Sequence, residues 1–198
     1  MPKIIDHDQR REDILDATWE LLVRGGIEAA TMREIAAQAG FANGALKHYF
    51  PGKDDIIKGA YERSLHRLGD HVAAATEGMR GLAALEVALR ATLPTAAADQ
   101  TASRILLSFW ERAAFSPELR DGYGDHLASW RAGLVQYLEE AREDGDIDSP
   151  VSNEQLVDEA VTMNIGATLL QALGTDYVNG DYLASHVDAF LDRIRVAR

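Results

Sequence analysis

The chain has 198 residues, of which 46% are hydrophobic and 26% are charged, as in an ordinary globular protein. No apolar run reaches the ~18 residues that a membrane-spanning helix needs, and the N-terminus lacks the apolar stretch of a signal peptide. We therefore expect a cytoplasmic protein without membrane contact. The absence of cysteine excludes disulfides, thiolate metal sites and cysteine nucleophiles.

The formal net charge of −12 is distributed unevenly along the chain. Residues 1–70 carry a net charge of −2, and residues 71–198 carry one of −10. Within residues 31–53, by contrast, the net charge is +2. A DNA-binding surface is usually basic, so the total argues against nucleic acid, but this one segment leaves room for a small basic face.

Helical periodicity runs through nearly the whole chain, and no segment alternates with the period of a β-strand. The pattern predicts about nine helices, at residues 8–24, from 31, 43–49, 53 to the mid-70s, 82–93, 105–113, 119–141, 153–173 and 183–194. Gly25 and Gly26 close the first of them. The sequence therefore predicts an all-α fold.

The helices change character near Phe50. Short, closely punctuated helices precede this residue, and long ones follow it. We predict an N-terminal three-helix domain over residues 1–52 and a helical body over residues 53–198. The helix that begins at Lys53 would connect the two.

A capping box marks the start of the second helix. In Thr31-Met32-Arg33-Glu34 the Thr31 hydroxyl would accept from the Glu34 amide, and the Glu34 carboxylate would reach back to the Thr31 amide. Gly40 follows where the chain must turn, in a left-handed conformation that bulky residues do not tolerate.

The segment after this turn has the spacing of a short packed helix. Leu46 and Phe50, at i and i+4, would pack it onto Ile35 and the first helix. Two short helices that cross over a Gly-containing turn form a helix-turn-helix, whose second helix enters the DNA major groove.

Residues 8–56 resemble the DNA-binding domain of the TetR family of transcriptional repressors. The resemblance rests on an Ile-Leu-Asp-Ala helix, on Thr31-Met32-Arg33-Glu34-Ile35-Ala36, on Ala39-Gly40, and on the run from Gly44 to Asp54. It implies a repressor that binds a palindromic double-stranded DNA operator as a homodimer, and that a small-molecule inducer releases.

The resemblance implies seven DNA-contacting residues: Thr31, Arg33, Asn43, Lys47, His48, Tyr49 and Lys53. The two hydroxyls and the Lys53 ammonium suit phosphate oxygens. Arg33, Asn43 and Lys47 suit base edges, because Arg and Lys pair with guanine and Asn with adenine. His48 would lie on the backbone or sugar.

Two positions depart from the family pattern. Ala42 stands where a serine often caps the recognition helix, so either Asn43 caps it or the cap is lost. Lys47 stands where tyrosine is frequent, which exchanges a thymine-methyl contact for a charge. Both changes make the operator sequence unpredictable.

Aromatic residues gather in the sixth to eighth predicted helices, together with a few polar side chains. Such a mixture is typical of a small-molecule cavity, although ordinary core packing is the alternative for each residue. In this family the cavity holds the inducer. The expected lining residues are Phe109, Trp110, Phe115, Tyr123, Trp130, Tyr137, Met163 and Asn164.

The body is similar to the branch of the family that contains choline-responsive repressors, through Phe109-Trp110 and Trp130-Arg131. Glu111 next to Trp110 would suit a cationic ligand by charge and cation–π attraction. Helix neighbours at i and i+1 point apart, which weighs against their acting together.

The eighth predicted helix is nearly free of charge after Asp158-Glu159. A helix that is apolar on all sides must be buried on all sides. We therefore predict a four-helix dimer interface that this helix forms with the apolar side chains of the last helix: Val187, Phe190, Leu191 and Ile194. Burial in the core of the monomer is the alternative.

Enzyme signatures are missing. Glu62, His66 and Asp70 follow one another at the i, i+4 spacing that metal ligands can share, but no His-Glu-x-x-His or Glu-x-x-His motif accompanies them. We expect neither an enzyme nor a metal or cofactor. The competing function is a helical protein–protein interaction module of the same fold that binds no operator.

Overall fold

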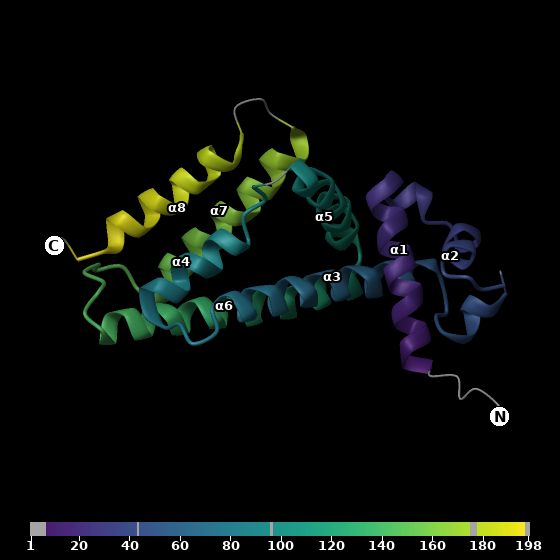
Figure 1. The fold of residues 1–198 in the computed structure, drawn as a ribbon, viewed down its shortest axis with the longest axis horizontal. Coiled ribbons are helices and arrows are strands. Elements are labelled where there is room, and N and C mark those ends of the chain that lie inside the picture. Colours follow the sequence, from purple (N-terminus) through teal and green to yellow (C-terminus); the bar gives the residue numbers. More distant parts are fainter. Residues whose placement is uncertain (1–6, 43, 96, 175–177, 197–198) are drawn as a thin grey trace.

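The computed structural model describes residues 7–42, 44–95, 97–174 and 178–196 (Figure 1). The helices are α1 (His7–Ala29), α2 (Met32–Gln38), the 3₁₀ helix η1 (Ala45–His48), α3 (Lys53–Ala75), α4 (Gly81–Ala91), α5 (Ala97–Phe115), α6 (Pro117–Glu143), α7 (Asn153–Leu173) and α8 (Gly180–Ile194). The predicted all-α fold is confirmed. Within the described ranges no helix has both the length and the hydropathy to cross a bilayer.

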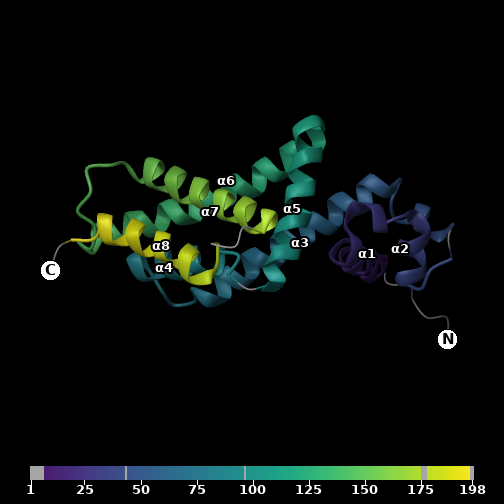
Figure 2. The ribbon, with the colours of Figure 1, turned by 90° about the horizontal axis from the view of Figure 1, so that it is seen from above.

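Two hydrophobic cores lie at the two ends of the molecule, and α3 extends from one to the other (Figures 1 and 2). The N-terminal core joins α1, α2 and η1 to the first half of α3, through residues such as Ile56 and Tyr61. The body core is built from α4, α6, α7 and α8, and Val72 of α3 packs against it.

The N-terminal core also includes side chains from the body. Ile105 and Phe109 of α5 and Leu119 of α6 are buried within it. Packing therefore crosses the predicted boundary between residues 52 and 53, and that boundary stays a prediction.

Polar contacts fix α3 against its neighbours. The Arg63 guanidinium donates to both Asp16 carboxylate oxygens of α1, at 2.9 and 3.1 Å. The buried Tyr61 hydroxyl donates to the Ile105 carbonyl of α5 at 2.6 Å, and burial raises the pKa of Tyr61. A buried hydroxyl that lost this acceptor would destabilise the fold by about 1–3 kcal/mol. Helix α3 is thus held to α1 on one side and to α5 on the other.

Glycines make the turns that the sequence predicts. Gly25 and Gly26 have non-helical dihedrals and kink α1, so that its regular part ends at the predicted place. Gly40 has a φ of +72°, the left-handed conformation expected between α2 and the next segment.

The predicted dimer interface is wrong for the last helix, because the apolar face of this helix is buried within the monomer. Val187, Phe190, Leu191 and Ile194 are between 0% and 4% exposed, because they fill the body core against α4 and α7. They belong to the monomer core, which was the alternative interpretation. Helix α7 instead leaves a narrow stripe uncovered, in which Leu169 is 39% and Leu173 62% exposed.

We expect Gly26→Ala to lower the free energy of unfolding by about 1–3 kcal/mol. Gly26 has φ +67° and ψ −165°, a backbone region that only glycine occupies without strain, and an added Cβ would meet nothing within 4 Å. The loss would therefore come from backbone strain alone. Urea unfolding monitored by circular dichroism measures it.

Gly124→Ala is the matched control. Gly124 lies inside α6, and its added Cβ would also meet nothing within 4 Å. We expect this variant to be as stable as the parent or more stable by about 0.5–1 kcal/mol, because alanine favours the helix. Equal effects of the two substitutions would contradict the strained kink.

Candidate nucleic-acid interface and small-molecule cavity

The predicted recognition helix is shorter than expected. Residues 43–49 were predicted to be helical, whereas the helix observed there is the 3₁₀ helix η1, here called the recognition segment (Ala45–His48). Gly44 precedes it without a side-chain cap, and the Ala45 amide donates to the Ala42 carbonyl at 2.9 Å. Asn43 lies outside the described residues.

The recognition segment has an inner and an outer side. Leu46 and Phe50 are 0% and 4% exposed in the N-terminal core with Ile35, as predicted. Lys47 and His48 are exposed. Two cationic or ionisable side chains are therefore presented to solvent by residues that are anchored from behind.

The capping box forms only in part. The Thr31 hydroxyl accepts from the Glu34 amide at 3.2 Å, but the Thr31 amide donates to the Ala29 carbonyl instead of to Glu34. The Glu34 carboxylate accepts from the Thr31 hydroxyl and, at 3.1 Å, from the Arg33 guanidinium. The bond from Arg33, and then that from Thr31, lowers the pKa of Glu34. Thr31 and Arg33, two of the predicted DNA contacts, therefore share the Glu34 carboxylate.

Tyr49 and Lys53 also make contacts within the protein. The half-buried Tyr49 ring meets the edge of Phe41, with centroids 5.5 Å apart. The Lys53 ammonium donates to the Ile27 carbonyl at 3.2 Å and so ties the start of α3 to the kinked end of α1. Sequence reasoning also missed Arg11, whose guanidinium donates to the Tyr49 carbonyl.

A cavity of about 590 Å³ lies between α3, α4, α5, α6 and α7. Five of the eight predicted ligand residues line it: Trp110, Tyr123, Trp130, Tyr137 and Asn164. Three of the aromatic residues are seven positions apart on α6 and form one stripe. The Asn164 amide donates to the Thr92 carbonyl at 2.9 Å, and the Tyr137 hydroxyl donates to Thr76 Oγ1 at 3.1 Å. We call this space the aromatic cavity.

The other three predicted ligand residues do not line the aromatic cavity. Phe109 is buried in the N-terminal core, where its ring centroid lies 4.3 Å from that of Tyr61. Met163 packs against the body core. Phe115 is 88% exposed at the end of α5.

Ionisable side chains complete the wall of the aromatic cavity. Glu62, His66 and Asp70 come from α3, and Asp125 and His126 come from α6. Burial, and then the charge of His66, lowers the pKa of His126. The i, i+4 spacing of Glu62, His66 and Asp70 was the sequence signal for the three residues on α3, although this spacing was considered only for metal binding. Within the described ranges no three His, Asp or Glu side chains are placed to hold a metal ion.

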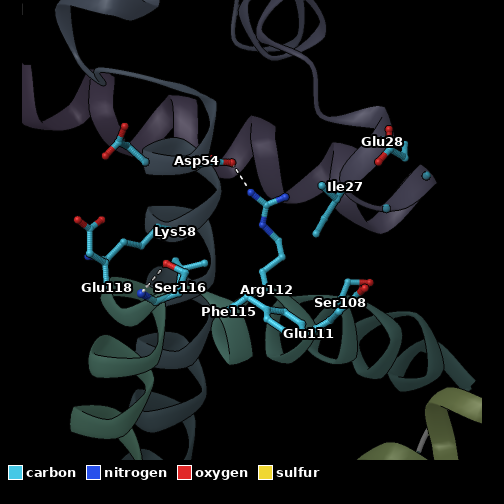
Figure 3. Close-up of a pocket in the computed structure, with 14 residues that line it drawn as sticks. Ile27, Glu28, Asp54, Lys58, Ser108, Glu111, Arg112, Phe115, Ser116 and Glu118 are labelled. Atoms are coloured by element: carbon cyan, nitrogen blue, oxygen red, sulfur yellow. Dashed lines mark hydrogen bonds and ion pairs between the residues drawn. The ribbon is translucent and has the colours of Figure 1, made fainter.

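A second, more open cleft of about 690 Å³ lies where the N-terminal helices meet the body, and we call it the junction cleft (Figure 3). Arg112 of α5 reaches across it to Asp54 in the first turn of α3 and forms an ion pair there. Phe115 and Glu111 line this cleft. Glu111 therefore lies away from the aromatic cavity that contains Trp110, because neighbouring helix positions point apart.

Two family descriptions match the chain. "Bacterial regulatory proteins, tetR family" matches residues 14–60, and "BetI-type transcriptional repressor, C-terminal" matches residues 81–196. The first match covers the recognition segment, and the second covers the body that encloses most of the aromatic cavity.

Curated relatives and solved structures agree with these matches. The HTH-type transcriptional regulator PksA of Bacillus subtilis is 31% identical over 144 residues, which are 71% of this chain and 69% of that protein. The HTH-type transcriptional regulator BetI 1 of Chromohalobacter salexigens is 31% identical over 124 residues, which are 61% of this chain and 60% of that one.

A crystal structure of a putative transcriptional regulator from Saccharomonospora viridis in complex with choline has the same fold. Its TM-score is 0.85 at 21% identity, covering 96% of this chain and all of that one. The family matches and the relatives are transcriptional regulators and not enzymes. The chain belongs to the TetR family of bacterial transcriptional regulators, and its body is of the BetI repressor type.

Proposed function

We propose that the chain is a repressor that binds a palindromic DNA operator as a homodimer and leaves it when a small-molecule inducer occupies the aromatic cavity. The observation that carries the DNA-binding half is the exposure of Lys47 and His48 on a segment whose Leu46 and Phe50 are buried. A side chain can read a base edge only if its backbone is held at the groove.

In this proposal, Lys47, Arg33 and Asn43 read bases, whereas Thr31 and Tyr49 bind phosphates. Arg33 and Thr31 exchange their shared partner Glu34 for DNA. Lys53 supports the site through the Ile27 carbonyl and adds positive charge beside the phosphates.

The homodimer is proposed to form through the exposed stripe of α7. Thr162, Leu169 and Leu173 recur there at helical spacing and are not covered by the rest of the chain. To bind the two halves of a palindrome, the two-fold pair must present its recognition segments about one DNA turn, ~34 Å, apart.

The inducer is proposed to be a small organic cation. Aromatic faces attract cations, and Trp110, Tyr123 and Trp130 of the aromatic cavity supply such faces. The carboxylates of Glu62 and Asp70 supply the opposite charge. The choline bound by the structural neighbour supports this class of ligand.

Release is proposed to act through α3. Its start is packed in the N-terminal core through Ile56 and Tyr61, and from Glu62 onward it lines the aromatic cavity with the carboxylates of Glu62 and Asp70. A cation that binds more tightly to one arrangement of α3 shifts the population toward that arrangement. The arrangement that it favours spaces the recognition segments wrongly for the operator.

Selection of bound fragments from a random DNA pool tests the DNA-binding half. We expect the parent protein to recover a palindrome and Lys47→Ala to prefer a different base at one position of each half-site, with about 1–3 kcal/mol of discrimination lost there. Lys58→Ala, which removes an equal charge at the junction cleft, is the control and should keep the parent preference. Recovery of no common sequence by the parent would refute operator binding.

Isothermal titration with choline and with 3,3-dimethylbutan-1-ol, its uncharged isostere, tests the class of inducer. We expect choline to bind at least tenfold more tightly, a difference of about 1.4 kcal/mol, because only the cation attracts the carboxylates and ring faces. Glu62→Gln should weaken choline alone. Asp192→Asn, a carboxylate on α8 that does not line the cavity, should change neither affinity. Equal affinities for both compounds would contradict a cation site.

The pH dependence of choline binding follows from His126. Its pKa is lowered from 6.5, so the imidazole is neutral at pH 7 and becomes charged only below 6.5. A charged imidazole repels the cation, so choline affinity should hold above pH 7 and fall as the pH drops through the lowered pKa. His126→Gln should flatten this fall, whereas a profile shared with the uncharged isostere would exclude charge repulsion as its cause.

A further inference from the structure

The recognition segment is too short to keep a fixed orientation by its own interactions. It has four residues, no side-chain cap, and one buried side chain of its own, Leu46. The amides of Tyr49 and Phe50 both donate to the Leu46 carbonyl at 2.9 Å and close its last turn. A helix of this length gains too few hydrogen bonds to offset the entropy of ordering it. Its orientation must therefore come from neighbouring elements.

Arg11 of α1 contacts the C-terminal end of the recognition segment in two ways. Its Nη1 donates to the Tyr49 carbonyl, and its guanidinium carbon lies 4.3 Å from the centroid of the Phe50 ring. Carbonyls at a helix end lack partners within the helix, so this charge-assisted bond satisfies one of them. The planar guanidinium can stack and donate at once, which a lysine ammonium cannot do.

Arg10 of α1 contacts a residue that precedes the recognition segment in the chain. The Arg10 guanidinium carbon lies 5.3 Å from the centroid of Phe41, a residue that precedes the segment. The Phe41 ring meets that of Tyr49, which also contacts the His7 ring at 5.3 Å between centroids. The first two turns of α1 thus touch the residues on both flanks of the recognition segment.

We propose that Arg11, assisted by Arg10, is a positioning residue that sets the orientation of the recognition segment for operator reading. The proposal rests on the proposed function. Arg11 acts by donating to the Tyr49 carbonyl and stacking on the Phe50 ring, both of which need its planar guanidinium. Attraction between its charge and DNA phosphates contributes less. A phosphate-binding arginine would behave differently, since lysine can replace it as a point charge.

The test compares Arg11→Lys and Arg11→Met with the parent, using the selected operator and an unrelated duplex of equal length over a series of salt concentrations. We expect Arg11→Lys to lower operator affinity about tenfold, to leave the unrelated duplex within twofold, and to keep the salt slope. Arg24→Lys is the matched control, because Arg24 is also exposed on α1 but binds Gln38 and Glu20. It should change neither affinity.

Three results would overturn the proposal. Arg11→Lys could retain the parent operator affinity, which would mean that charge alone suffices. Arg11→Met could lower both affinities alike and reduce the salt slope by about 0.9, which would assign Arg11 to a phosphate. The melting temperature of Arg11→Lys could fall together with operator affinity in proportion, which would reduce its role to general stability.

Hydrogen exchange without DNA separates this proposal from the proposed function. We expect Arg11→Lys to speed exchange of the Tyr49 and Phe50 amides about tenfold, whereas the amides of α5 and α6 keep the parent rates. Unchanged exchange at Tyr49 and Phe50 would contradict positioning by Arg11 even if an operator is found. Faster exchange in a protein that selects no operator would leave the positioning role intact and refute DNA binding alone.

Discussion

Helix α3 belongs to two hydrophobic cores at once, and most of the molecule is arranged around that constraint. Ile56 and Tyr61 fix its first half among the N-terminal helices, and Val72 packs its second half against the body. The Tyr61 hydroxyl adds a buried bond to the Ile105 carbonyl of α5. Close-packed interiors change by discrete rearrangement and not by gradual stretching. A displacement of α3 in the body must therefore change the packing of α3 in the N-terminal core.

The same constraint explains why the aromatic cavity is suited to regulation. The Glu62 and Asp70 carboxylates of the cavity belong to α3, the helix that also packs into the N-terminal core. The aromatic stripe of the cavity belongs to α6. A bound molecule that contacts both helices favours one distance between them. Arg112 of α5, paired with Asp54 at the first turn of α3, is a second connection between the same two parts of the molecule.

An acidic chain can still contain a locally basic segment, since residues 31–53 carry a net charge of +2, and two carboxylates of the N-terminal helices are paired within the protein. Asp16 binds Arg63 and Arg67, and Glu34 binds Arg33. Exposed charges farther apart than the Debye length of about 8 Å are largely screened at physiological salt. The net charge of −12 therefore says little about the local field at Lys47.

Features set by neighbouring residues in the chain could be predicted from the sequence. The cap at Thr31, the left-handed Gly40, the burial of Leu46 and the single stripe of Tyr123, Trp130 and Tyr137 all follow from spacing or backbone sterics. This is why the all-α fold agrees with the prediction and why five of the eight predicted ligand residues line one cavity.

Features set by packing between distant elements could not be predicted. Phe109 and Phe115 have the same chemistry and lie six residues apart, yet one is 3% and the other 88% exposed. The partner of Lys53 is a carbonyl 26 residues away, and that of Arg11 is one 38 residues away. No local pattern encodes such pairs, because they depend on how α1 crosses the segments that follow it.

The most direct test of release through α3 is the distance between the two N-terminal domains of a dimer. The chain has no cysteine, so Ala37→Cys on the exposed side of α2 accepts a single spin label per protomer. We expect one main distance without ligand and a shift of that distance when an organic cation such as choline saturates the aromatic cavity. A dimer whose distance stays unchanged with the cavity saturated would contradict release through α3.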